Sequence, residues 1–407
     1  MLIFKSEKMM RKIIPSFIIL LLATTTLCLI IWFNIEKEPG ALIPKFSWQG
    51  KKKVGNELIE LKRTVQGLSI PSFWPRSLAI RRNCLYAADY WNHHLQILKI
   101  NSDGSLTPQF IFGKKGESLG EFNKPQKLII KGNYLYVAET GNHRIQILKI
   151  KSDGSLTPKF IFGKRGEGLV EFFSGPNDLI IREDYLYVAE TGNGHILILK
   201  INSDGSLSPR FIFGKKGESL KDFNPGKLGI EKNYLYAADD HNNLIHILKI
   251  NSNGSLSPKF IFGKRGKWGR GLGEFSSGPD NLIIKVSHLY VTDVDNHHIQ
   301  IFKINPDGSL TPKFIFGKKG KSLGEFDIPG KLIIKGSYLY VADTGNHHIQ
   351  VLKINPDGSL TPKFIFGKKG EGLGKFFIPN DLLIKENYLY VSDAGNDRIQ
   401  TLEIKYQ

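Results

Sequence analysis

The chain has 407 residues, of which 41% are hydrophobic and 23% charged, and this hydrophobic content is normal for a globular protein. Its 56 Lys and Arg against 38 Asp and Glu give a formal net charge of +18, which favours anionic partners without identifying one. Only two cysteines are present, Cys28 in an apolar segment and Cys84 in an expected core strand, which excludes a fold held by a disulfide framework.

The amino terminus carries a predicted membrane segment. Residues 1–12 form a short basic tail, and residues 13–33 follow without a charge, long enough to cross a bilayer core as a helix. The positive-inside rule places the tail in the cytoplasm and the rest of the chain outside, as a single-pass protein. A cleaved signal is the alternative and would make the protein secreted, but the stretch 23–27 is a poor cleavage site.

A linker is expected at residues 34–56, where Pro39, Gly40, Pro44 and the lysine run 51–53 interrupt regular structure. The lysine run reads as a solvated spacer, with contact to anionic lipid headgroups as the alternative.

The remainder of the chain, residues 57–407, repeats one pattern seven times at steps of 50, 51, 49, 54, 50 and 50 residues. Each copy contains a Leu-Tyr pair followed by small or branched residues. The tyrosines of the seven copies are Tyr86, Tyr136, Tyr187, Tyr236, Tyr290, Tyr340 and Tyr390.

One copy predicts four antiparallel strands. Residues 331–335 are a short apolar run, 338–343 are rich in aromatic and branched residues, and 348–354 alternate. An Asn-Pro-Asp-Gly turn then leads to a fourth strand at 362–366, with proline at its start, where a missing N–H does least harm. Four-stranded units at this spacing are typical of propeller blades.

The fourth strand, FIFGK(K/R)G, occurs only six times, and the chain ends just after the third strand of the last copy. Residues 57–65 (ELIELKRTV) are expected to supply the missing strand and close the ring, which removes exposed sheet edges. The sequence therefore predicts an all-β, seven-bladed β-propeller.

These motifs resemble the NHL repeat. The copy that begins at Gly120-Glu121-Phe122 continues through Pro125 to the turn and strand at 139–146, ETGNHRIQ, and fits that pattern closely. The resemblance implies a propeller fold and a choice of RNA-binding, protein-binding, sensor or lyase functions. The arginine of the NHL pattern is retained only at Arg144 and Arg398, and histidine replaces it in most copies.

One face of the propeller should carry the connections from second to third and from fourth to first strands. The acid and the asparagine of each turn, for example Asp343 and Asn346, are interpreted as turn chemistry because every copy has them. Histidines such as His347 and His348 follow these turns and are interpreted as polar rim residues, because adjacent side chains diverge and cannot easily chelate one metal.

Six loops on this face carry a dibasic pair and would form a ring of twelve cations, tempered by nearby acids. A solvated loop and a surface for polyanions are equally supported readings. The loops near Lys267, Arg270 and Lys321 are the more basic ones.

A second ring is expected where each first strand begins, at the mouth of the central channel. It consists of Ser77, Lys127, Asp178, Lys227, Asn281, Lys331 and Asp381. Its mixed charges favour ion pairs between blades, and they also make it the best candidate site for a small molecule.

Departures from the repeat give further candidate binding residues: Trp91, Trp268 and Arg270, together with the dibasic pair Lys318 and Lys319. Exposed tryptophan and arginine are typical anchors of binding interfaces.

The sequence thus favours a membrane-anchored, extracytoplasmic binding module, without a required cofactor, for a protein or an anionic polymer. The anchor argues against nucleic acid as a partner. The alternative is a lyase or lactonase with a divalent metal at the channel mouth, held by Asp178 and Asp381. The near-identity of the copies favours the binding module over the enzyme.

Overall fold

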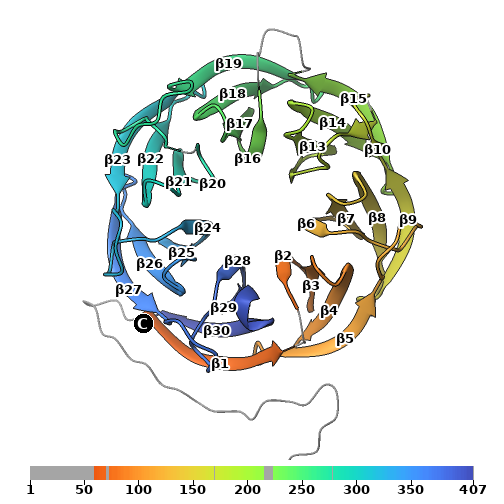
Figure 1. The fold of residues 1–407 in the computed structure, drawn as a ribbon, viewed down its shortest axis with the longest axis horizontal. Helices are drawn as coiled ribbons and strands as arrows, with labels where there is room; N and C mark the ends of the chain where they lie inside the picture. Colours follow the sequence, from red (N-terminus) through yellow and green to blue (C-terminus); the bar gives the residue numbers. More distant parts are fainter. Residues whose placement is uncertain (1–58, 70–72, 169, 215–222, 277, 407) are drawn as a thin grey trace, which may run out of the picture. The chain divides into compact units, whose positions relative to one another are not determined.

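The computed structural model of the protein describes residues 59–69, 73–168, 170–214, 223–276 and 278–406. Its strands form seven four-stranded antiparallel sheets, arranged as blades around a central axis (Figure 1). The predicted all-β, seven-bladed propeller is therefore confirmed.

The first strand of each blade is innermost and lies next to the first strands of the neighbouring blades (Figure 1). These strands are β2 (Pro75–Arg81), β6 (Pro125–Lys131), β12 (Asp178–Arg182), β16 (Pro225–Glu231), β20 (Asn281–Lys285), β24 (Pro329–Lys335) and β28 (Pro379–Lys385). The second strands are β3 (Cys84–Asp89), β7 (Tyr134–Glu139), β13 (Tyr185–Glu190), β17 (Tyr234–Asp239), β21 (His288–Asp293), β25 (Tyr338–Asp343) and β29 (Tyr388–Asp393).

The third and fourth strands complete each blade toward the outside. The third strands are β4 (His94–Ile100), β8 (Arg144–Ile150), β14 (His195–Ile201), β18 (Leu244–Ile250), β22 (His298–Ile304), β26 (His348–Ile354) and β30 (Arg398–Tyr406). The fourth strands are β5 (Leu106–Phe112), β9 (Leu156–Phe162), β15 (Leu207–Phe213), β19 (Leu256–Gly263), β23 (Leu310–Phe316), β27 (Leu360–Phe366) and β1 (Ile59–Ser69).

The last blade closes the ring with strands from both ends of the described chain. β1 pairs antiparallel with β30, from Ile59 opposite Tyr406 to Ser69 opposite Arg398. The prediction that an amino-terminal strand completes this blade is confirmed, although the strand extends to Ser69 rather than ending at residue 65. Residues 57 and 58 lie outside the described part.

The hydrophobic core lies between adjacent blades rather than in one central cluster. One cluster, for example, joins Tyr136 and Ile147 of the second blade to Leu186 and Leu197 of the third, and all four side chains are fully buried. Since a single sheet buries little apolar surface alone, each blade depends on both neighbours.

The repeated tyrosine of each blade contacts the long hairpin of the next blade. The hydroxyl of Tyr187 donates a hydrogen bond of 3.0 Å to the carbonyl oxygen of Gly254, in the hairpin of the next blade. Gly254 has a φ of +85°, and an added Cβ would lie 2.6 Å from the ring of Tyr185, so only glycine fits there. The same contact joins Tyr86 to Gly154, Tyr136 to Gly205, Tyr236 to Gly308, Tyr290 to Gly358 and Tyr390 to Gly104.

The predicted start of the fourth strand at proline is wrong. β27 begins at Leu360, so Pro362 lies inside the strand, next to a register shift between Val351 and Leu352 of β26. A proline is tolerated there because the strand is the outermost of its blade and the bulge already interrupts the ladder.

The propeller has two faces with different connections. The face with the two-residue turns between first and second strands and the Asp-Gly hairpins is called here the hairpin face. The opposite face, called the loop face, carries the turns between second and third strands, including the 3-10 helix η1 (Ala394–Asn396), and the loops that link one blade to the next. One of these loops contains the short parallel pair β10 (Lys164–Arg165) and β11 (Glu171–Phe172).

The predicted membrane segment at residues 13–33 lies outside the described residues. Within the part of the chain that the structure describes, no helix has the length and apolar character needed to cross a membrane.

Candidate functional site

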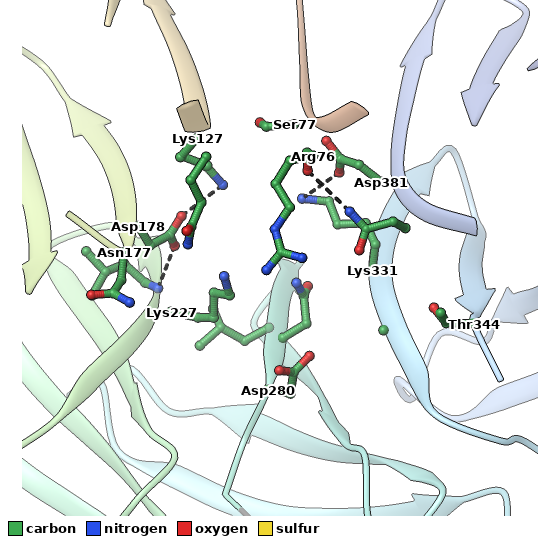
Figure 2. Close-up of a pocket in the computed structure, with 16 residues that line it drawn as sticks. Arg76, Ser77, Lys127, Asn177, Asp178, Lys227, Asp280, Lys331, Thr344 and Asp381 are labelled. Carbon is green, nitrogen blue, oxygen red and sulfur yellow. Dashed lines mark hydrogen bonds and ion pairs between the residues drawn. The ribbon is translucent and has the colours of Figure 1, made fainter. Parts of the chain in front are cut away.

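A polar pocket of about 290 Å³ lies on the loop face at the mouth of the central channel (Figure 2). Its walls are the beginnings of the first strands, because these strands start at the loop face and surround the axis. The pocket is lined by all seven positions of the ring proposed from the sequence: Ser77, Lys127, Asp178, Lys227, Asn281, Lys331 and Asp381.

Two ion pairs join neighbouring blades across this ring. Lys127 Nζ lies 2.8 Å from a carboxylate oxygen of Asp178, and Lys331 Nζ lies 3.5 Å from one of Asp381. Pairing between blades therefore occurs at two of the ring's boundaries.

Both aspartates also hold the next blade through its backbone. The carboxylate of Asp178 accepts the backbone N–H of Leu228 at 3.0 Å, and that of Asp381 accepts the N–H of Leu78 at 2.8 Å. Ser77 Oγ accepts the N–H of Leu128 at 3.2 Å in the same way. These side chains therefore act first as clamps between blades.

The pair of Lys127 and Asp178 keeps its charges despite burial. Burial opposes the charged form of Lys127, but attraction to Asp178 outweighs it and the pKa of the lysine is raised. Burial likewise opposes ionisation of Asp178, but Lys127 and Lys227 outweigh it and the pKa of the carboxyl is lowered. An ionised pair is the stable state of this part of the ring.

Lys227 differs from the other two lysines. Among the described residues, no carboxylate oxygen lies within 4.0 Å of its ammonium group. Burial lowers the pKa of Lys227, since attraction to Asp178 is partly opposed by repulsion from Lys127 and Lys331. This lysine is therefore a half-buried cation that lines the pocket.

Two charged residues of the pocket were not identified from the sequence, Arg76 and Asp280. Figure 2 shows the Arg76 side chain extending from β2 across the pocket toward the side where Lys227 and Asp280 lie. Both residues stand one position before the predicted ring, where the other blades have Gln126, Asn177, Gly226, Gly330 and Asn380. They could have been found by comparing the residue directly before each ring position, which is charged in only two of the seven blades.

Asp280 is the one pocket carboxylate that is not used as a clamp. Within the described residues it makes no ion pair shorter than 4.0 Å, and it is exposed to the pocket. Partial desolvation by the walls of the pocket raises the pKa of Asp280, repulsion from Asp240 adds to the shift, and attraction to Lys227 and Arg76 opposes it. A carboxyl with a raised pKa beside two cations, in a concave site, is typical of groups that take part in proton transfer.

The residues of the pocket do not fit a divalent metal. Asp178 and Asp381 already accept backbone N–H groups and face lysines, and four cationic side chains line the pocket with them. Among the described residues there is also no group of three His, Cys, Asp or Glu side chains that could hold a metal ion. The electrostatics favour an anionic ligand instead.

The dibasic loops lie outside the pocket, and they do not form a uniform ring of free cations. In four described loops the first lysine of the pair bridges to a glutamate of the same loop. These pairs are Lys114–Glu121, Lys164–Glu171, Lys264–Glu274 and Lys318–Glu325, at 3.3, 3.1, 2.6 and 3.3 Å. The nearby acids thus pair with the first lysine in four of the loops that the structure describes, which lowers the charge expected from the ring of cations.

The candidate anchors also lie away from the pocket. Trp91, in the turn after β3, is 55% exposed and has Lys124 Nζ 5.5 Å from the centre of its ring. Trp268 is 84% exposed and, like Arg270, lies on the loop between β19 and β20. Lys318 and Lys319 lie on the next such loop, between β23 and β24.

The repeated turn residues have the structural role predicted for them. The acid of each turn is fully buried; for example, the carboxylate of Asp343 accepts the Nδ2–H of Asn346 at 2.9 Å and the backbone N–H of Asp327 at 2.8 Å. His348 Nε2 lies 2.9 Å from the same carboxylate. In this blade the acid, the amide and the histidine therefore satisfy one another, whereas Arg144 and Arg398 take the place of the histidine beside Glu139 and Asp393 in two other blades.

Two family descriptions match the chain. The family described as "Lactonase, 7-bladed beta-propeller" matches residues 74–314, which is more than half of the chain. The LVIVD repeat matches residues 330–349 and 379–398. The expectation of a propeller family is thus confirmed at that level, whereas neither match is to the NHL repeat. No curated protein matches the chain.

Several solved structures share the fold at low sequence identity. A putative 6-phosphogluconolactonase from Bacteroides uniformis has a TM-score of 0.60 and 16% identity, covering 77% of this chain and 94% of that one. A periplasmic gluconolactonase from Pseudomonas aeruginosa has a TM-score of 0.58 and 14% identity, covering 79% and 89%. A streptogramin B lyase has a TM-score of 0.55 and 13% identity, covering 86% and 98%.

Proposed function

Because the chain belongs to the family of seven-bladed lactonase β-propellers, we propose that it binds and hydrolyses a small, hydroxyl-rich, anionic lactone at the channel mouth. The observation that carries this proposal is the group formed by Asp280, Lys227 and Arg76, whose charges are not used to hold blades together. The similarity in fold to a gluconolactonase and a putative 6-phosphogluconolactonase supports sugar-derived lactones as the substrate class.

In the proposed reaction, Asp280 accepts a proton from a water molecule as the water oxygen attacks the lactone carbonyl carbon. Lys227 and Arg76 stabilise the negative charge that develops on the carbonyl oxygen. The bond between the carbonyl carbon and the ring oxygen then breaks, and the ring oxygen leaves as a hydroxyl after taking the proton from Asp280. The product is an open-chain hydroxy acid. Its new carboxyl group releases the remaining proton of the water to solvent, and the resulting carboxylate is attracted to the same cations.

The proposal is tested by following the hydrolysis of glucono-δ-lactone and of its 6-phosphate with the purified protein, against the spontaneous rate. Asp280→Asn should lower kcat by roughly 10² to 10⁴-fold, the usual contribution of a general base. Asp295→Asn is the matched control, because Asp295 is an exposed carboxylate of the same blade outside the pocket. Hydrolysis no faster than the spontaneous rate, or an equal loss in both variants, would refute the proposal.

The sequence also suggested a divalent metal held by Asp178 and Asp381, and this remains a separate proposal that the charges of the pocket disfavour. Metal analysis of the purified protein tests it directly. About one ion per chain in the wild type, lost in Asp178→Ala and Asp381→Ala, would support the metal site over the arrangement proposed here.

A membrane-anchored binding module for a protein or an anionic polymer remains a second candidate function. The observation that favours it is the exposed second cation of the dibasic pairs, for example Lys319 and Lys369. The resemblance to NHL repeats supports this candidate function, because NHL propellers serve as binding surfaces. Membrane fractionation, with protease accessibility of the propeller from either side, tests the anchor and the extracytoplasmic location together.

A further inference from the structure

Three consecutive loops of the loop face form a strongly basic region, called here the basic sector. It consists of residues 263–275, 317–326 and 367–376, which lead into β20, β24 and β28. These loops carry four basic residues against one acid, three against one, and three against one. The corresponding loops at 113–122 and 163–172 each carry two basic and two acidic residues, so they are neutral overall.

Three cations of the basic sector are exposed and are not neutralised by a local ion pair of the described residues. Lys267, Arg270 and Lys321 are exposed, and no carboxylate oxygen of the described residues lies within 4.0 Å of their cationic groups. In the third loop, Lys375 stands at the position where the other described loops have a glutamate that bridges to the first lysine. The basic sector therefore holds net charge that the neutral loops lack.

Trp268 projects from the middle of the basic sector between Lys267 and Arg270. It is 84% exposed, and no ring or cation of the described residues contacts its indole, in contrast to Trp91 beneath Lys124. A flat aromatic ring that is left bare beside cations is suited to stacking on the C–H face of a sugar ring while its neighbours pair with acidic groups.

An anionic membrane is a less suitable occupant of this surface. Trp268 is the only large apolar side chain of the described basic sector that is more than half exposed, whereas a face that inserts into lipid presents several.

We propose that the basic sector binds a linear acidic polysaccharide, with its carboxylates on the exposed cations and one sugar ring stacked on Trp268. The three loops lead into the first strands of three neighbouring blades, so an extended polymer can reach all three in turn (Figure 1). This binding is independent of the proposed lactone hydrolysis, because none of these side chains lines the pocket.

The test measures binding of the full chain to polygalacturonate and to inorganic polyphosphate at two salt concentrations. Polyphosphate provides charge without a sugar ring. Lys267→Gln with Arg270→Gln should weaken binding of both polymers by roughly tenfold, and the binding should fall with added salt. The matched control is Lys115→Gln with Arg165→Gln, which removes the same charge from the two neutral loops and should weaken binding by less than about twofold.

The variant Trp268→Ala distinguishes the contribution of sugar stacking to binding from the contribution of charge. It should weaken binding of polygalacturonate by roughly fivefold or more and leave binding of polyphosphate unchanged. Equal losses in the sector and control variants would mean that net charge alone drives binding and would overturn the proposal. Tighter binding to anionic lipid vesicles than to polygalacturonate, or no effect of Trp268→Ala on the polysaccharide, would overturn it too. The rate of lactone hydrolysis should be unchanged in Trp268→Ala and in Lys267→Gln with Arg270→Gln, because these side chains lie outside the pocket.

Discussion

The hairpin face and the loop face of this propeller are built from the same repeat, but residues recur more strictly on the hairpin face than on the loop face. On the hairpin face, the contact of a tyrosine hydroxyl with a glycine carbonyl recurs at six boundaries between blades, for example between Tyr187 and Gly254. On the loop face, equivalent positions differ from blade to blade, as Lys127, Asp178 and Lys227 do. The comparison indicates that a repeated contact holds the blades together at the hairpin face. At the loop face some departures from the repeat, such as Asp178, clamp neighbouring blades, and others, such as Asp280, are where binding is proposed.

The largest effect on stability is expected from a change to the repeated hairpin contact. Gly205→Ala places a side chain at a φ of +85°, with its Cβ 2.4 Å from the ring of Tyr134. Strain and overpacking together should lower the free energy of unfolding by about 2–4 kcal/mol. Chemical denaturation monitored by tryptophan fluorescence measures this loss.

Gly132→Ala is the matched control for that change. Its φ of +57° is also left-handed, but an added Cβ meets no atom within 4 Å. It should therefore cost only the backbone strain, about 1 kcal/mol. Equal losses in the two variants would show that contact between the blades adds nothing at Gly205.

On the loop face, the pH dependence of turnover should reflect the ionisation of Asp280 and Lys227 in the pocket. The pKa of Asp280 is raised, so its carboxylate protonates and turnover falls at a higher pH than for an ordinary aspartate, by about tenfold per pH unit. The pKa of Lys227 is lowered, so the stabilising charge is lost at a lower pH than for an ordinary lysine as pH rises.

This narrowed pH window is checked by initial rates of lactone hydrolysis, corrected for the spontaneous reaction at each pH. Asp280→Asn should remove the acidic limb of the profile. An acidic limb at the ordinary aspartate pKa of about 3.9 would contradict the assignment of Asp280 as the base.

Deleting one hydroxyl of the hairpin face should have a smaller effect than the change at Gly205. Tyr187→Phe leaves the ring in the core but removes the donor to Gly254, which should cost about 1–2 kcal/mol of unfolding free energy. Turnover and polymer binding should not change, since the contact is remote from the loop face. Tyr185→Phe is the comparison, because no described hydrogen bond uses the Tyr185 hydroxyl, and its stability should stay close to that of the wild type.

Much of the fold could be predicted from the sequence because each blade repeats the same local signals. Asp-Gly turns, alternating strands and a missing fourth strand were enough to predict seven blades and closure by an amino-terminal strand. The position of Pro362 was misplaced because a strand on the outer edge tolerates a residue without an N–H, and the sequence of one blade does not reveal which strand is outermost.

The candidate site could be predicted only in part. Counting from each first strand identified the ring that contains Lys127 and Asp178, because the register of a repeat is fixed. Arg76 and Asp280 were missed because nothing local indicates that the residue one position before the ring also lines the pocket. Nor could the sequence tell that Asp178 is held by a lysine and a backbone N–H, while Asp280 has no such partners.

By itself, then, the sequence determined the repeat, the number of blades and which positions depart from the common pattern. These properties follow from local turn chemistry and strand periodicity, which need no knowledge of distant contacts. Only the tertiary structure decided which charges neutralise one another, because Lys127 and Asp178, or Lys331 and Asp381, come from different blades some fifty residues apart. The ring brings them together. Binding is expected at Lys227, Asp280 and Arg270, which make no ion pair shorter than 4.0 Å within the described residues.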